Sequence, residues 1–207
     1  EAPAAAAFDT SKYETIQDAA ALQTWIDRIY TRGYVAVDTE TTGLNEMRAD
    51  LVGVSLCVQA GEAAYLPLAH RAGQSDDLFG TDALAEGQMD QKTALAMLKP
   101  MLEDSTILKI GQNMKYDAKI LARVGIQVAP IDDTMLMSYA QNGGLHNHGM
   151  DLLSERYLDH APISIKTLLG SGKSAITFDR VPIDEASRYA AEDADITLRL
   201  WQYLKPR

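Results

Sequence analysis

Cysteine is almost absent from this chain of 207 residues, which contains Cys57 alone. A single cysteine excludes a disulfide within the chain, and this composition is typical of proteins that work in a reducing compartment. We therefore expect a cytoplasmic location. Cys57 lies in the apolar run LVGVSLCV, which predicts a small buried core residue.

Long apolar runs are also missing. No stretch approaches the roughly 18 apolar residues that indicate a membrane span, and the N-terminal EAPAAAAF lacks the basic start and apolar core of a signal peptide. Hydrophobic residues make up 46% and charged residues 23% of the chain, which is the balance of a globular protein with a substantial core. We expect no association with a membrane.

Basic residues are too few to balance the acids. The chain has 19 Lys and Arg against 29 Asp and Glu, so the formal net charge is −10. Proteins that hold nucleic acids tightly usually neutralise phosphates with a basic face, so this balance argues against a strong nucleic-acid binder. A phosphodiester-cleaving domain remains compatible with it, if bound metal ions neutralise the site or an attached partner holds the DNA.

The length fits one domain of ordinary size. Residues 1–12 are rich in alanine and show no usable apolar period, so we interpret them as a linker or as the cut end of an excised piece. Residues 13–207 are expected to form the folded domain, and they contain no internal repeat.

The first half of the domain shows one helical pattern followed by strand patterns. The helix is predicted from apolar residues at the spacing i, i+3, i+4 and i+7, namely Leu22, Trp25, Ile26 and Ile29. Gly33 is placed to end it. The strand runs are 34–37, 51–58 and 63–68. Short glycine-containing turns separate these runs, which predicts an antiparallel meander.

The second half is mostly helical. We predict helices at 91–103, 113–124, 133–141, 150–157 and 182–204, a strand at 106–110, and loops at 71–90 and 142–149. Asp184 is a plausible N-cap of the last helix. Three strands followed by alternating helix and strand indicate an α/β fold, with helices packed on a mixed sheet.

Acidic residues stand where a buried core is expected. Asp38 ends an apolar strand and Glu40 follows two residues later, so both carboxylates project to the same side of an extended chain. Asp117 and Asp193 each lie on the apolar face of a predicted helix. An isolated buried carboxylate is costly, so such acids are usually paired or bound to metal.

Four carboxylates from three distant segments suit hard cations such as Mg²⁺ or Mn²⁺, which prefer oxygen ligands. Two ions about 3.5–4 Å apart stabilise both the attacking and the leaving oxygen of a phosphoryl displacement. Tyr189 precedes Asp193 by one helical turn, and Asn113 precedes Asp117 in the same way. An acid at a strand end is, taken alone, more often a turn or cap residue, so the metal-site hypothesis depends on the convergence of these acids in space.

Three motifs resemble those of a known family. The segments are Asp38-Thr39-Glu40-Thr41-Thr42-Gly43-Leu44, Gly111-Gln112-Asn113-Met114-Lys115-Tyr116-Asp117 and Tyr189-Ala190-Ala191-Glu192-Asp193-Ala194-Asp195. Their order and wide spacing resemble the DEDD exonuclease superfamily in its tyrosine variant. Their wording looks like the 3′→5′ proofreading exonuclease domain of bacterial DNA polymerase I. The likeness runs from about residue 13 to the C-terminus.

The resemblance implies an RNase H-like fold with a mixed five-stranded sheet. It implies two divalent metal ions, Mg²⁺ or Mn²⁺, held by Asp38, Glu40, Asp117 and Asp193. Tyr189, with Glu40, is implied to position the water that attacks the terminal phosphodiester. The implied contacts to the last nucleotides of a DNA 3′ end come from Thr39, Leu44, Asn113 and Tyr116.

The resemblance also implies a polymerase domain attached to this one in the full-length protein, and a place in the bacterial nucleoid. Two alternatives stay open. An RNA 3′-end exonuclease of the same superfamily is one, and a catalytically silent domain that braces a polymerase is the other. All four acids are present, so we expect activity.

Other signals in the sequence are discounted. The segment 169–174 (LGSGKS) lacks the glycine that a phosphate-binding loop requires, since Thr167 stands at that position. His146 and His148 lack further zinc ligands at suitable spacing and are expected at the surface. Glu192 and Asp195 are expected to face solvent or to cap local charge, with a supporting role near the site as the alternative.

Overall fold

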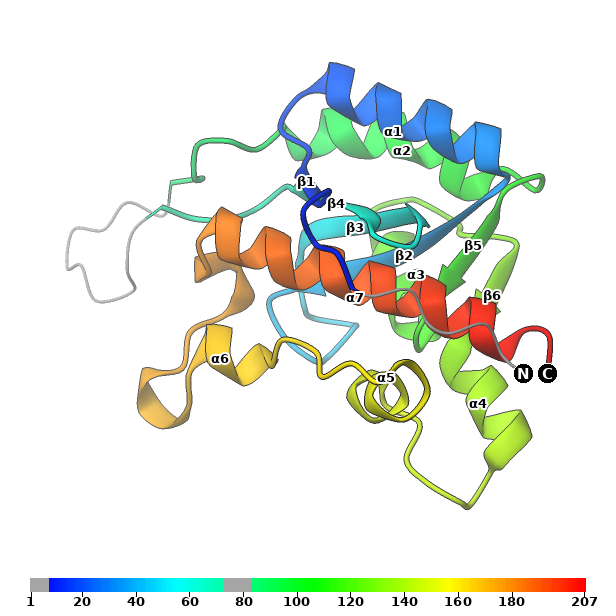
Figure 1. Ribbon diagram of the computed structural model, residues 1–207. Helices are drawn as coiled ribbons and strands as arrows, with labels where there is room; N and C mark the ends of the chain where they lie inside the picture. Colours follow the sequence, from blue (N-terminus) through cyan, green and yellow to red (C-terminus); the bar gives the residue numbers. More distant parts are fainter. Residues whose placement is uncertain (1–7, 73–82) are drawn as a thin grey trace.

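The protein is described from a computed structural model, in which residues 8–72 and 83–207 are placed. Residues 1–7 of the predicted linker and residues 73–82 of the predicted loop lie outside the described residues. The expected mixed α/β fold is confirmed, with a sheet flanked by helices (Figure 1). None of the described helices has the length and apolar composition needed to cross a bilayer.

The sheet is mixed and has the strand order β1-β4-β3-β2-β5-β6. Its strands are β1 (Glu14–Thr15), β2 (Tyr34–Thr41), β3 (Leu51–Gln59), β4 (Glu62–Pro67), β5 (Leu108–Gly111) and β6 (Ile131–Asp133). Strands β2, β3 and β4 form the predicted antiparallel meander, while β1, β5 and β6 pair in parallel with their neighbours. Within residues 8–72 and 83–207 the sheet thus has six strands, one more than expected. Strands β1 and β6 span two and three residues, too few to show an apolar period.

The predicted helices are confirmed to within a residue or two. They are α1 (Ala19–Arg32), α2 (Gln91–Glu103), α3 (Met114–Arg123), α4 (Thr134–Asn142), α5 (Met150–Leu158) and α7 (Ile183–Leu204). A short helix α6 (Ile165–Leu169) and 3-10 turns at Gly172–Ser174 and Phe178–Arg180 were not predicted. The prediction that Asp184 caps α7 is wrong. Pro182 occupies the N-cap position, and Asp184 lies in the first turn. A negative charge there interacts favourably with the helix dipole.

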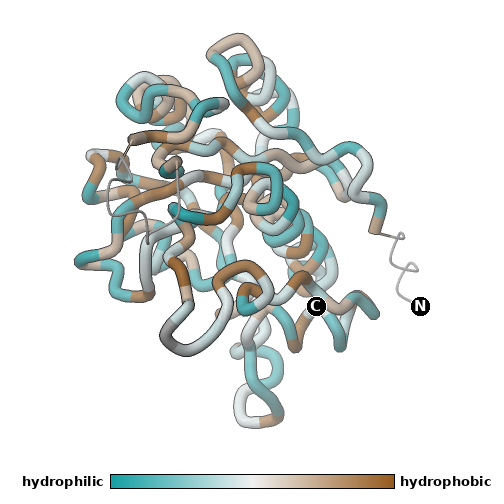
Figure 2. The backbone as a smooth tube through the Cα atoms, turned by 90° about the vertical axis from the view of Figure 1, so that its left-hand side faces the viewer, coloured by the Kyte–Doolittle hydropathy of each residue, from teal (hydrophilic) through white to brown (hydrophobic). Residues whose placement is uncertain are grey.

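Helices cover both faces of the sheet. Figure 1 shows α1 and α2 side by side on one face and α7 running across the other. Brown and teal stretches alternate along the helices in Figure 2, as expected for helices with one buried face. The larger core lies under α1 and α2, and Cys57 is buried in a second cluster beneath α7, as predicted.

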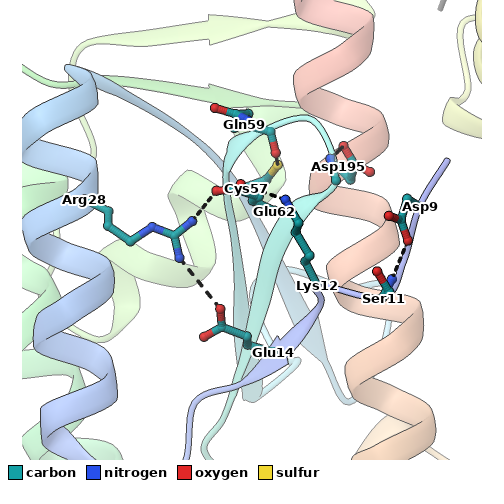
Figure 3. Close-up of polar contacts among 10 residues, drawn as sticks. Asp9, Ser11, Lys12, Glu14, Arg28, Cys57, Gln59, Glu62 and Asp195 are labelled. Carbon is teal, nitrogen blue, oxygen red and sulfur yellow. Dashed lines mark hydrogen bonds and ion pairs between the residues drawn. The ribbon is translucent and has the colours of Figure 1, made fainter. Parts of the chain in front are cut away.

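Helix α7 is fixed from the side opposite the site by Asp195. Its carboxylate is fully buried, accepts hydrogen bonds from the Tyr13 hydroxyl (2.8 Å) and the Gly61 amide (3.0 Å), and pairs with Arg199 (2.9 Å). Figure 3 shows Asp195 beside the β3–β4 turn, near the ion pairs of Glu62 with Arg28 and Lys12. The expectation that Asp195 faces solvent is wrong, because the N-terminal segment covers this face of the helix.

One carboxylate orders the starts of two helices. Asp133 accepts hydrogen bonds from the amides of Asn113 and Met114 at the start of α3, and from those of Met135 and Leu136 at the start of α4. Unpaired amides at a helix N-terminus need such acceptors. The Asn113 side chain makes no cap hydrogen bond of its own, so it remains available to the cleft described below.

Gly53 on β3 allows Tyr65 of β4 to lie flat across the sheet. A β-carbon at Gly53 would stand 2.1 Å from the Tyr65 hydroxyl oxygen. Tyr65 has no freedom to retreat, because its side chain is fully buried and its hydroxyl is hydrogen-bonded to Nε2 of His70 at 2.9 Å. Gly53 pairs with Glu40 across the β2–β3 ladder, so this close approach lies directly behind the site.

We therefore expect Gly53→Ala to lower the free energy of unfolding by about 2 kcal/mol, the usual cost of overpacking a fixed core. Urea denaturation followed by circular dichroism measures it. Gly43→Ala is the matched control, because a β-carbon there meets open space and the backbone φ is not positive. Equal stability of the two variants would show that Tyr65 moves without cost.

Candidate active site

A single cleft collects the residues singled out in the sequence. It measures about 510 Å³. Its lining includes all nine predicted site residues: Asp38, Thr39, Glu40, Leu44, Asn113, Tyr116, Asp117, Tyr189 and Asp193. These residues come from β2 and the turn after it, from the start of α3 and from α7, so the convergence on which the metal-site hypothesis depends is present in the fold. Their individual roles stay predictions.

Three of the carboxylates face one another at the centre of the cleft. One oxygen each of Asp38, Glu40 and Asp193 lies within 4.8 Å of the other two. Alternation along β2 turns Asp38 and Glu40 toward α7, on the face where Ala36 packs against that helix. A break in the β2–β3 register follows Glu40, so the ladder becomes irregular at the point where the strand leaves the site.

Asp117 joins the cluster through Thr39, whose side chain points to the other face of β2. The Asp117 Oδ1 atom accepts hydrogen bonds from the Thr39 amide (3.0 Å) and hydroxyl (2.5 Å). Both residues are buried. The hydroxyl of Thr39, which the resemblance assigns to the terminal nucleotide, thus donates to a carboxylate of the cluster.

The oxygens of this cluster suit a cation. The Glu40 Oε1 atom is buried and has no hydrogen-bond partner within the described chain. A buried carboxylate oxygen without a donor costs free energy, and a divalent ion is the group that most directly satisfies it. The donor set is all oxygen, which matches Mg²⁺ or Mn²⁺ rather than a softer metal.

Burial raises the pKa of every carboxyl in the cluster. Desolvation is the largest cause in each case, and repulsion from neighbouring acids raises the pKa of Asp38 and Glu40 well above their ordinary values. Burial raises the pKa of Asp117 to about 7, although the hydrogen bonds from Thr39 oppose the shift. It raises the pKa of Asp193 to about 8. Without a cation, the site therefore holds protons that a free carboxyl would release.

Tyr189 lies beside Asp193, one helical turn earlier on α7. Burial is the main cause that raises the pKa of its phenol, and the negative charges of Asp193, Glu40 and Asp38 raise it further. Tyr189 therefore keeps its proton across the physiological range. In this environment it acts as a hydrogen-bond donor and not as a base.

The other end of the cleft is apolar. Leu44 is 96% exposed at the tip of the turn after β2. The Tyr116 hydroxyl holds this turn, since it donates to the carbonyl of Gly43 (2.6 Å) and lies 2.6 Å from the Thr41 hydroxyl. Apolar residues that the sequence did not single out line the same cleft: Ile165, Leu169, Ile176 and Phe178. Their only signal was the spacing of Ile165 and Leu169 by one helical turn.

Glu192 departs from the expectation of a solvent-facing residue. It is only 4% exposed, and its carboxylate contacts His160 (2.9 Å) and the Ile163 amide (2.7 Å). The expectation failed because residues 191–200 of α7 are almost entirely covered, by the sheet on one side and by the segments around α5 and the N-terminus on the other. A helix covered on both sides loses the one-sided pattern that sequence reasoning assumes.

The mixed sheet with helices on both faces has an RNase H-like fold. Two solved structures share the fold. Brucella melitensis NrnC has a TM-score of 0.65 and 24% identity over 95% of this chain and 80% of its own. Escherichia coli RNase D, an exoribonuclease, has a TM-score of 0.65 and 19% identity over 94% of this chain and 44% of its own.

The chain belongs to the 3′-5′ exonuclease family, whose model matches residues 13–207. DNA polymerase I of Rhizobium leguminosarum is 50% identical over the whole of this chain and 21% of its own length. DNA polymerase I of Pseudomonas aeruginosa is 40% identical over 93% of this chain and 20% of its own length. The chain thus spans about a fifth of the length of these relatives.

The raised pKa values predict how stability depends on pH without metal. The native cluster binds protons that the unfolded chain releases near pH 4, so the native state is the more protonated one as pH rises from about 4 to about 8. Unfolding then releases protons, and stability falls as pH rises through this window. We expect Tm in EDTA to be several degrees lower at pH 8 than at pH 5, since about 1 kcal/mol moves Tm by about 2–4 °C in a domain of this size.

Asp193→Asn should flatten this pH dependence and raise Tm at pH 8, because it removes one of the repelling charges. Calorimetric scans at both pH values measure it. Glu155→Gln, at an exposed position of α5, is the control and should leave the pH dependence unchanged. A Tm that rises toward pH 8 in EDTA would contradict the proton-holding cluster.

Proposed function

We propose that this chain is a metal-dependent 3′→5′ exodeoxyribonuclease domain that releases 5′-mononucleotides from DNA 3′ ends, as the proofreading part of a DNA polymerase I. The observation that carries the proposal is the convergence of four acids in one cleft, with a buried Glu40 oxygen that lacks a donor. Family membership and the polymerase relatives support the same reading.

Asp38, Glu40, Asp117 and Asp193 are the residues that would hold the metal. When bound, two divalent ions would stabilise the negative charge on the attacking and leaving oxygens of a phosphodiester displacement. One of the solved NrnC structures contains bound Mg²⁺. Thr39 keeps the Asp117 carboxylate in place through two hydrogen bonds, so β2, α3 and α7 each present carboxylate oxygens to the same cleft.

Tyr189 and Glu40 orient the water that attacks the terminal phosphodiester. The phenol keeps its proton, so it donates a hydrogen bond to the water and leaves proton acceptance to a carboxylate. A positioned water has already lost the translational and rotational entropy that a free water would lose in the transition state, so the activation barrier is lower. The products are a 5′-mononucleotide and a strand one residue shorter with a free 3′-OH.

The apolar end of the cleft receives the terminal base. Leu44 offers an apolar surface that any base can stack against, because every base has a flat face. Asn113 and Tyr116 lie where the strand approaches the carboxylates. A frayed, mismatched end enters such a cleft at lower cost than a paired end, which favours removal of mismatches. With a net charge of −10, the chain depends on an attached polymerase domain to hold the duplex.

An RNA 3′-end exonuclease is the second candidate. The observation in its support is the fold that this chain shares with RNase D. The third is a silent domain that braces a polymerase. Matched DNA and RNA oligonucleotides of one sequence separate the first two candidates. Calorimetric titration with Mn²⁺ separates the third, because a silent domain should not bind the metal with two-site stoichiometry.

We expect Asp38→Ala to reduce the cleavage rate roughly 10³-fold or more, since it removes a ligand of the metal ions that stabilise the transition state. The assay uses 5′-labelled single-stranded DNA on a denaturing gel, with Mg²⁺, Mn²⁺ or EDTA. A ladder that shortens from the 3′ end, and disappears with EDTA, is the expected wild-type result. Glu155→Ala is the control with an exposed acid removed. Wild-type turnover in Asp38→Ala would refute the metal assignment.

We expect Tyr189→Phe to slow cleavage by about 10–100-fold, a typical loss when a group that orients a metal site is removed. Asp193→Ala should slow it on the order of 10³-fold or more, because a ligand itself is lost. Single-turnover rates at saturating Mn²⁺ measure both variants. The reverse order would mean that Tyr189 does more than orient water.

A further inference from the structure

The apolar wall of the cleft stands on a segment with little packing of its own. Helix α6 has five residues, and none of them is buried. Ile165 and Leu169 line the cleft and are only partly buried against the cluster that contains Phe178. A short helix without a buried face does not hold its place by packing alone. The position of this wall therefore depends on what anchors residues 159–164, which lead into it.

Ser154 of α5 holds the start of this segment, since its hydroxyl donates to the His160 carbonyl at 2.8 Å. The second anchor is Glu192 of α7. Its Oε1 atom lies 2.9 Å from Nε2 of His160, and its Oε2 atom accepts a hydrogen bond from the Ile163 amide at 2.7 Å. The carboxylate is nearly fully buried. One side chain thus spans the segment just before α6 and ties it to the helix turn that carries Asp193.

The His160 imidazole also has an aromatic contact on its face. The Phe8 ring stacks on it at a centroid distance of 3.6 Å and an interplanar angle of 11°. The Arg199 guanidinium lies 4.1 Å above the Phe8 ring and pairs with the buried Asp195. A continuous set of contacts therefore runs from Asp195 through the N-terminal segment to Glu192, and both acids lie on α7.

Packing alone does not explain why a carboxylate is buried at position 192. A buried carboxylate is costly, and this one adjoins Asp193 in a region where acids already repel one another. An apolar residue would stabilise the same position at lower cost if packing were the only requirement. The two contacts made by Glu192 both go to the segment that carries the cleft wall, which gives the carboxylate a positioning task.

We propose that Glu192 is a positioning residue, which holds Ile165 and Leu169 beside the carboxylate cluster through His160 and the Ile163 amide, so that the wall grips the terminal base. This inference rests on the proposed exonuclease function for its effect on substrate, but the anchoring itself does not depend on it. Loss of the anchor weakens the hold on the strand end and leaves the metal-binding acids in place.

The test compares Glu192→Ala with Glu192→Gln in the 207-residue chain. Glutamine preserves both contacts, because its oxygen accepts from the Ile163 amide and its amide group donates to Nε2 of the His160 tautomer that has its proton on Nδ1. Alanine preserves neither. His160→Ala is a second variant, which removes one contact and keeps the other. Glu155→Ala serves as the surface control.

The first readout is amide hydrogen exchange in EDTA, without substrate. We expect Glu192→Ala to speed exchange in residues 159–169 at least tenfold, while α1 exchanges as in the wild type, and we expect glutamine to restore protection. Unchanged exchange in Glu192→Ala, or loss of protection in Glu192→Gln equal to that in alanine, would overturn the anchoring role. This readout holds even if the chain does not cleave DNA.

The second readout is the dependence of cleavage rate on DNA concentration. We expect Glu192→Ala to raise KM about tenfold with kcat within about twofold of the wild type, as for partial loss of one stacking contact. His160→Ala should raise KM less, and glutamine should restore it. A fall in kcat at unchanged KM would assign Glu192 to the metal site and refute the proposal. Absence of cleavage by the wild type would refute the proposed function, and the exchange result would then decide the anchor alone.

Discussion

Repulsion among buried carboxylates is the constraint on which the rest of this structure depends. Asp38, Glu40 and Asp193 bring oxygens within 4.8 Å of one another in a cleft where Glu40 and Asp193 are buried and Asp38 is partly buried. Such an arrangement opposes folding unless protons or a cation neutralise it. The pKa values of all four acids are raised, so without a cation these carboxyls tend to keep their protons. The fold must therefore hold the acids together against their own repulsion.

The structure meets this demand with polar contacts that fix each element from behind. Asp133 orders the start of α3, which presents Asn113 and Asp117. Asp195 fixes α7 on the face away from the cluster, through Tyr13, Gly61 and Arg199. These acids are fully partnered, unlike Glu40 in the cleft. The contrast between satisfied acids behind the site and an unsatisfied acid within it supports the proposed cation site.

The cleft joins two environments that suit the two parts of a nucleotide. Its charged end offers only oxygens, and its other end offers Leu44 and the wall of Ile165 and Leu169. The charged end stands on β2 and α7, whereas the apolar end stands on a turn and a five-residue helix. Rigid elements thus carry the acids, while the less firmly packed segments carry the surfaces that the proposed function assigns to different bases.

The sequence by itself determined the longer helices, the antiparallel meander and the four acids, because apolar periodicity and three motifs are local properties. It did not predict the short helix α6. It also pointed to the mixed α/β class, but the two short strands β1 and β6 form only where neighbouring strands are already in place. Only the tertiary structure decided that Glu192 and Asp195 are buried. Their helix is covered on both sides, and which segments cover it depends on contacts between residues as distant as Phe8 and His160. The apolar pattern of a sequence predicts which face of a helix packs on the core, whereas the burial of each residue depends on every segment that packs around the helix.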